Sequence, residues 1–140
     1  MKKLLMVLVL HCLIGTTFAQ KNFNPIHFTK ITTTNPANQS KIEGDIHINT
    51  KDSVIVINEN PAKKLLISVI APEQTAVTGN NILVMWVAFL CTTADNKSCT
   101  VTVVRQKETG KKDLMVVKVD YDNDGKVSTS YDCDYLKDLY

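Results

Sequence analysis

The sequence lacks the short motifs that would assign it to a familiar enzyme class. Only five glycines occur in its 140 residues, and none of them belongs to a glycine-rich phosphate loop. The chain has no Gly-x-Ser-x-Gly or Ser-x-x-Lys motif and no cysteine paired with a placed histidine. Because nucleophilic catalysis needs such a set of residues, we expect a protein that binds rather than an enzyme.

Histidine is also scarce, with three in the chain. His27 and His47 each fall on the polar side of an expected strand, and no His-x-x-x-His or Cys-x-x-Cys spacing accompanies them. If the two strands were neighbours, the rings could approach one another and hold a transition metal. Without a supporting motif, we interpret them as two unrelated surface histidines.

The apolar run at the start of the chain is too short to span a bilayer. Two lysines precede the run Leu4–Ile14, and small residues lead to a cleavage-like position at Ala19. This order is typical of a signal peptide over residues 1–19, which export removes. We therefore expect a secreted or periplasmic protein whose mature part, residues 20–140, forms a single β-rich domain without a transmembrane segment.

The mature chain has no excess of charge of either sign. Loss of Lys2 and Lys3 with the leader reduces the 16 basic residues to 14, which equals the number of acidic residues. A neutral surface gives no reason to expect nucleic acid as a partner.

The dominant pattern in the mature chain is alternation of apolar and polar residues with period two, which predicts strands with one buried face. About eight short strands, each bounded by turn residues, indicate an all-β fold, namely a small antiparallel barrel or sandwich. The expected strands cover Ile26–Thr34, Ile42–Ile48, Val54–Ile57, Leu65–Ala71, Ile82–Leu90, Thr100–Val104, Leu114–Val119 and Val127–Tyr131.

Three segments depart from simple alternation. Ile82–Leu90 is apolar throughout, which favours a central strand that is buried on both faces. Residues 71–81 form the longest expected irregular connection. Near the C-terminus, Leu136 and Tyr140 are four residues apart, a spacing that predicts a short capping helix.

Three cysteines remain beyond the leader. Cys91 and Cys99 flank a polar turn and stand at equal distances from the tip of an expected hairpin. Such residues face each other, and in an oxidising compartment they predict a disulfide, provided that they form a non-hydrogen-bonded pair. Reduced thiols or a metal pair are the alternatives. Cys133 is left over, either as a buried structural thiol or as an exposed one available to another chain.

The sharpest candidate for a cofactor site is the acidic segment 120–125. Asp120, Asp122 and Asp124 stand at alternate positions before a glycine, as in the first half of an EF-hand loop, and calcium prefers such oxygen ligands. The match fails at the twelfth position, where Tyr131 replaces the bidentate glutamate, and the flanks resemble strands. A calcium loop within a hairpin and a plain Asp-Gly turn both remain open.

These features favour a non-enzymatic binding or interaction module of the cell envelope or exterior, which would use a barrel mouth or a sheet face. The alternative is a calcium-dependent module or small hydrolase that uses the acidic C-terminal segment, residues 113–140. A third hypothesis is an assembly component with an exposed edge strand beside Ile82–Leu90. The sequence predicts no cofactor unless calcium binds the acidic segment, and the partner stays unspecified.

Overall fold

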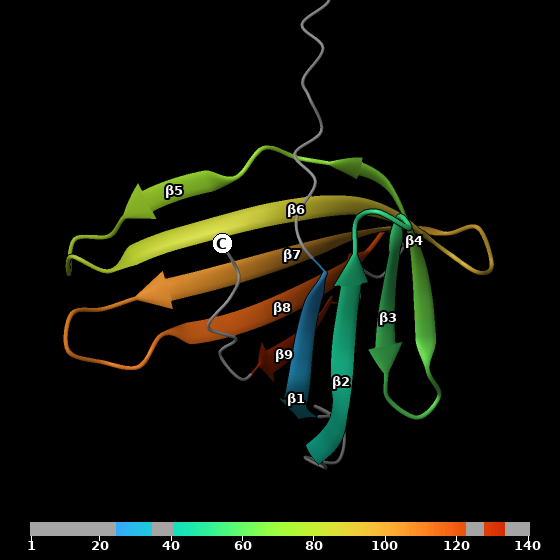
Figure 1. Cartoon of the computed structure of the whole chain (residues 1–140), viewed down its shortest axis with the longest axis horizontal. Coiled ribbons are helices and arrows are strands. Elements are labelled where there is room, and N and C mark those ends of the chain that lie inside the picture. The colour runs from blue at the N-terminus through green and yellow to red at the C-terminus, as the bar shows by residue number, and fades with distance from the viewer. Residues whose placement is uncertain (1–24, 35–40, 123–127, 134–140) are drawn as a thin grey trace, which may run out of the picture.

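The computed structural model describes residues 25–34, 41–122 and 128–133, and these residues form one antiparallel β-sheet that curls into a nearly closed barrel (Figure 1). No helix occurs in these ranges, so none could cross a membrane there. The strands are β1 (Ile26–Thr34), β2 (Lys41–Asn49), β3 (Val54–Asn58), β4 (Lys63–Ile70), β5 (Gln74–Val77), β6 (Leu83–Thr93), β7 (Ser98–Lys107), β8 (Leu114–Tyr121) and β9 (Ser128–Cys133).

Eight of the strands make the barrel wall. Strands β1 to β4 pair in chain order, β4 then pairs with β6, and β6 to β9 continue the wall until β9 returns to β1. Within the described residues, the ladder between β1 and β9 contains two residue pairs, Ile31 with Cys133 and Thr32 with Asp132. The predicted all-β antiparallel barrel is therefore confirmed in place of a sandwich. The predicted leader and C-terminal helix lie outside the described residues.

Alternation decides which side chains fill the barrel. Successive strand residues point to opposite faces of a sheet, so one residue in two faces the interior. The largest fully buried side chains include Tyr131, Phe28 and Phe89, which come from three different strands. The buried hydrophobic residues form one cluster that occupies the space enclosed by the wall. The interior is thus a packed core.

Strand β6 is buried on one face only, contrary to the expectation for Ile82–Leu90. Val87, Phe89 and Cys91 are buried, whereas the alternate residue Leu90 is 46% exposed. The reason is architectural, because the outer surface of a single-layered barrel faces solvent where no second layer covers it.

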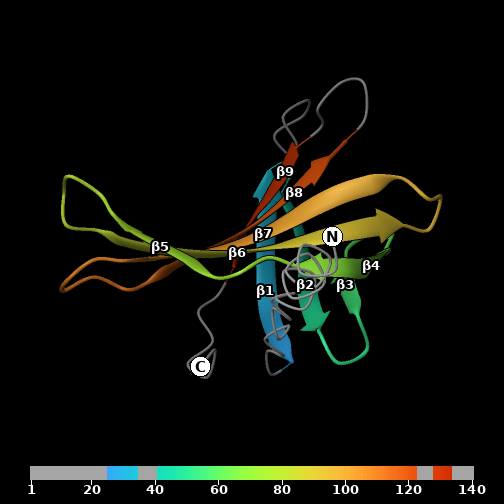
Figure 2. The same ribbon diagram turned by 90° about the horizontal axis from the view of Figure 1, so that it is seen from above.

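Strand β5 lies within the connection 71–81 that was expected to be irregular, so that expectation is wrong for four residues. Its burial does not alternate, because all four residues are exposed. It pairs with Leu83–Trp86 at the start of β6, and β4 pairs with the later part of the same edge of β6. Figure 2 shows β5 with β6, β7 and β8 extending away from β1, β2 and β3 as an arm.

A glycine allows β2 and β3 to approach closely where the wall bends. A Cβ atom added to Gly44 would lie 2.1 Å from the main-chain oxygen of Asn58, a distance that no real contact allows. Gly44 stands opposite Ile31, directly after the irregularity in β1 between Phe28 and Ile31. Glycine inside a strand is typical of such close backbone approaches.

Replacing Gly44 should therefore destabilise the barrel. We expect Gly44→Ala to lower the free energy of unfolding by about 1–3 kcal/mol, because the new methyl group must displace the β3 backbone. Gly79→Ala is the matched control, since an added Cβ there has no atom within 4 Å. Denaturant unfolding followed by circular dichroism measures both. Equal stability of the two variants would contradict the close approach.

Candidate functional site

The strongest candidate for a ligand site is a cleft of about 440 Å³ at one end of the barrel. The start of β4, the hairpin between β6 and β7, the end of β8 and the start of β9 meet there. Its lining residues are Ala62, Lys63, Lys64, Leu65, Thr93, Ala94, Asp95, Lys97, Tyr121 and Thr129.

Strand alternation turns part of this lining toward the barrel axis. Lys63 lies two residues before the buried Leu65, and Tyr121 lies two residues after the buried Val119. Because the side-chain period of a strand is two, both residues face the same way as the core residues next to them. The polar groups of the cleft therefore stand directly over the end of the packed interior.

A buried carboxylate lies beside the cleft and connects opposite parts of the wall. The side chain of Glu59, in the connection between β3 and β4, is only 6% exposed. It forms an ion pair with the Lys63 ammonium, and the Tyr131 hydroxyl donates to both of its oxygens at 3.2 Å. Tyr131 belongs to β9, whereas Glu59 directly follows β3, and strands β2 and β1 lie between β3 and β9 in the sheet. This contact bridges the joint that closes the barrel.

The same network shifts two pKa values. Burial raises the pKa of Tyr131 to about 12, and the nearby Glu59 carboxylate acts in the same direction. Burial alone would lower the pKa of Lys63, but the hydrogen bond to Glu59 and the charges of Tyr131 and Tyr121 raise it overall. Below pH 10 Lys63 is therefore a cation and Tyr131 a neutral hydroxyl donor.

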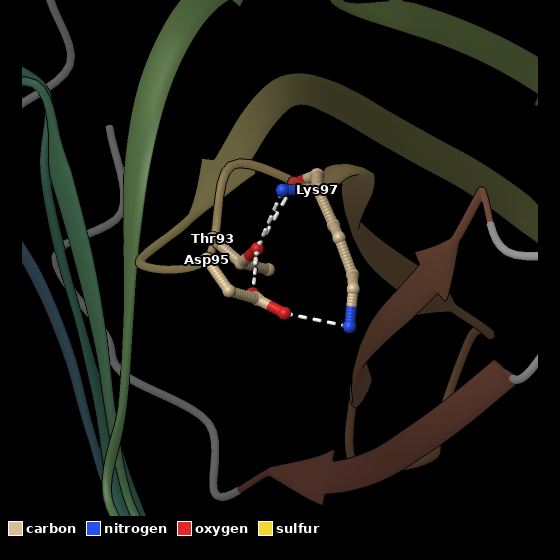
Figure 3. A network of polar contacts seen from close by, with 3 residues as sticks. All are labelled: Thr93, Asp95 and Lys97. Atoms are coloured by element: carbon tan, nitrogen blue, oxygen red, sulfur yellow. Dashed lines mark hydrogen bonds and ion pairs between the residues drawn. The ribbon is translucent and has the colours of Figure 1, made fainter.

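The hairpin between β6 and β7 forms the opposite rim of the cleft, and Figure 3 shows the side chains that hold it. The Thr93 hydroxyl donates to Asp95 Oδ1 at 2.6 Å and accepts from the Lys97 main-chain nitrogen at 3.0 Å. Lys97 Nζ lies 2.6 Å from Asp95 Oδ2. Lys97 and then Thr93 lower the pKa of Asp95 to about 2. These contacts close a tight turn, in which Asn96 adopts a left-handed conformation with φ of 60°.

The chemistry of the cleft combines positive charge with an aromatic face. Three lysines and one aspartate are the charged residues of the lining. Lys63 Nζ lies 5.9 Å from the centre of the Tyr121 ring, within the range of a cation–π contact. The buried Leu65 and the small side chains of Ala62 and Ala94 add apolar surface. An anion with an apolar part matches this combination.

The two cysteines predicted to pair do face each other, but they form no bond. Cys91 and Cys99 are register partners in the β6–β7 ladder, as predicted, yet both are free and buried thiols. The main-chain oxygen of Ser98 accepts a hydrogen bond from the main-chain nitrogen of Asp122, so Ser98 faces away from β6. Because main-chain groups of successive strand residues face opposite edges, those of Cys99 face β6. The cysteines consequently form a hydrogen-bonded pair, in which side chains stand farther apart. The condition for the predicted disulfide therefore fails.

The environment of these thiols also opposes reactivity. Burial, with a smaller contribution from Cys99, raises the pKa of Cys91 to about 12, and burial likewise raises the pKa of Cys99. A protonated thiol is a poor nucleophile and a poor metal ligand. Cys133 is a partly buried thiol that donates to the Tyr131 main-chain oxygen at 3.4 Å.

The predicted calcium ligands are only partly described. Asp120 lies in β8, where its carboxylate forms an ion pair with Lys118 at 2.9 Å, and hydrogen bonds from Lys118 and Ser128 lower its pKa. Asp122 is exposed, and Asp124 lies outside the described residues. Calcium binding by this segment stays a prediction.

The two histidines are not unrelated. His27 and His47 are register partners on β1 and β2, away from the cleft, and both contact the carboxylate of Asp45. Asp45 was not singled out from the sequence, although its position two residues before His47 places both on one face of a strand. Lys63, Glu59 and the cleft were missed as well. The cleft and the Glu59–Tyr131 contact join distant segments, and the Glu59–Lys63 spacing of four residues was not singled out.

Comparison with known proteins finds no counterpart. No protein-family model, no curated protein and no solved structure matches the chain.

The contact between Glu59 and Tyr131 should contribute to stability. Tyr131→Phe keeps the buried ring but removes the hydroxyl donor, so we expect the free energy of unfolding to fall by about 1–2 kcal/mol. In a Glu59→Gln background the same substitution should cost less, because the charged acceptor is gone. Denaturant unfolding of both single variants and the double variant measures this coupling. Strict additivity would contradict a direct interaction.

Proposed function

We propose that this protein is an exported, non-enzymatic binding module that takes a small organic anion with an apolar part into the cleft at the barrel mouth. The single observation that carries the proposal is the placement of three lysines around an aromatic and apolar floor at one end of the barrel.

The packed core favours the mouth over the interior as the binding site. Large side chains such as Tyr131, Phe28 and Phe89 fill the space inside the wall. The cleft above them has a volume of about 440 Å³, which lies within the range of small-molecule sites. A ligand would rest on the core without displacing it.

Charge favours an anion over a cation. Lys63 and Lys97 each have an acidic partner, but Lys64 adds a further cation to the lining. Lys97 is 54% exposed, so its ammonium can contact a ligand while it stays near Asp95. Water-accessible ammonium groups beside apolar surface suit a carboxylate or sulfonate that is attached to a ring or chain.

A pair of dyes that differ in one charged group tests this proposal. We expect anilinonaphthalene sulfonate to bind the folded protein and to raise its melting temperature, and the uncharged phenyl-naphthylamine to bind more weakly. Lys97→Gln should weaken sulfonate binding about two- to fivefold, because it removes one exposed charge. Fluorescence titration measures both affinities.

Lys118→Gln is the matched control, because Lys118 also pairs with an aspartate but does not line the cleft. Ala94→Trp should block binding of both dyes by filling the cleft. Sulfonate binding that is unaffected by Ala94→Trp and Lys97→Gln would overturn the cleft as the binding site. Turnover of a substrate by the purified protein would overturn the non-enzymatic part.

Export is tested separately from binding. The N-terminal pattern of the sequence supports cleavage after Ala19. We therefore expect mass spectrometry of the protein recovered from outside the cytoplasm to show a chain that begins at Gln20. Recovery of the intact chain in the cytoplasm would contradict export and leave the cleft experiment unaffected.

A further inference from the structure

Three side chains with metal-binding atoms converge on the outer surface of β1 and β2. His27 and His47 are direct register partners, so their side chains leave the sheet on the same face. Asp45 lies two residues before His47 in β2 and therefore shares this face. The donor atoms of all three residues lie within 4.8 Å of one another.

The two imidazoles are aimed at one oxygen. His27 Nε2 lies 3.0 Å and His47 Nε2 lies 2.8 Å from the same Asp45 Oδ2 atom. The rings stack with their centres 3.6 Å apart and an interplanar angle of 22°. With the ring protons on Nδ1, both Nε2 atoms would offer a lone pair beside the same carboxylate oxygen.

A second layer of contacts fixes the carboxylate. Asn58, the register partner of Asp45 on β3, forms a side-chain hydrogen bond with it. The close approach of β2 and β3 at Gly44 brings the Asn58 backbone next to this part of β2. Metal ligands in proteins are commonly oriented by such outer hydrogen bonds.

We propose that His27, Asp45 and His47 form a binding site for a divalent transition-metal ion such as Zn²⁺. Donor atoms bound to zinc at about 2.0–2.1 Å with tetrahedral angles stand about 3.3 Å apart. The nitrogen–oxygen distances of 3.0 and 2.8 Å differ from that value by a few tenths of an ångström. The stacked imidazole rings must also turn out of their near-parallel arrangement to direct both Nε2 atoms at the ion, and both side chains are exposed enough to do so.

The donor set and its exposure define the class of ion. Two imidazole nitrogens and one carboxylate oxygen suit zinc, copper or nickel better than calcium or magnesium, which prefer oxygen ligands. The histidine side chains are 45% and 46% exposed, so water completes the coordination from the solvent side. This site is separate from the acidic segment that contains Asp120.

Metal binding would also stabilise the pairing of β1 with β2. The ion would connect β1 to β2 across a ladder that runs from the Ile26–Ile48 pair to the Thr34–Lys41 pair. An ion that binds the folded state but not the unfolded chain stabilises the fold in proportion to its occupancy. The melting temperature should therefore rise with zinc concentration.

Titration calorimetry of the metal-free full chain with ZnCl₂ tests the site. We expect one ion per chain and at least tenfold weaker binding in both His27→Gln and His47→Gln. Asn58→Ala should weaken binding about tenfold, because it releases the carboxylate without removing a ligand. Zinc should raise the melting temperature of the wild type and leave that of His47→Gln unchanged.

Two control variants separate this site from other donors. Cys133→Ser and Asp120→Asn should bind zinc as the wild type does, because neither residue belongs to the cluster. If a histidine variant fails to fold, imidazole NMR signals of the wild type provide the readout, and zinc should shift those of His27 and His47. Wild-type affinity in both histidine variants, unshifted imidazole signals, or the absence of zinc binding would each overturn the proposal.

Discussion

The structure depends on filling the interior of a barrel whose wall is one sheet thick. With a single layer, every inward-facing position must supply volume, and the buried cluster draws on β1, β2, β3, β4, β6, β7, β8 and β9. No helix covers the outside of the described wall, so stability comes from side chains that meet across the axis. Tyr131 and Phe28, both fully buried, stand on the two strands that close the ring. Core packing therefore contributes to closure together with the ladder between β1 and β9.

A filled interior moves ligand chemistry to the surface. Polar side chains can stay solvated at two kinds of position. One is an inward-facing position at the end of a strand, as for Lys63 and Tyr121, and the other is the outer face of the wall, as for His27 and His47. Both candidate sites follow this rule. The buried Glu59 carboxylate is the exception, and it is tolerated because Lys63 and Tyr131 both contact it.

Local pattern was enough to predict the wall but not the sites. Period-two alternation located most of the barrel strands, because burial of one face selects apolar residues at every second position, and the continuous apolar run Ile82–Leu90 located β6. It missed β5, whose exposed residues Gln74–Val77 carry no such selection. It also left the histidines unrelated, because the approach of His27 to His47 depends on the register between two strands. Likewise, the 72 residues that separate Glu59 from Tyr131 hide their contact from any local pattern.

The cysteine pair shows the same limit at a finer scale. Equal distance from the hairpin tip correctly predicted that Cys91 faces Cys99. Whether such a pair can form a bond depends on which strand edge its main-chain groups face. The turn decides this, because the hydrogen bond from the Thr93 nitrogen to the Lys97 oxygen makes Thr93 and Lys97 a hydrogen-bonded pair, and the pair two residues further along each strand is of the same kind. The pair type thus depends on the geometry of the turn, which the spacing of the two cysteines does not reveal.

Two consecutive residues at the end of β3 link the candidate sites. The Asn58 side chain contacts Asp45 in the histidine cluster, and the next residue, Glu59, contacts Lys63 at the barrel mouth. Gly44 allows the main chain to pass close to β2 at this point. A displacement of the main chain at Asn58 would therefore shift the residues that contact Asp45 and Lys63 together. The solvent-facing groups of the two sites are different. Close backbone packing at one glycine thus positions the chemistry on both the outer face and the end of the barrel.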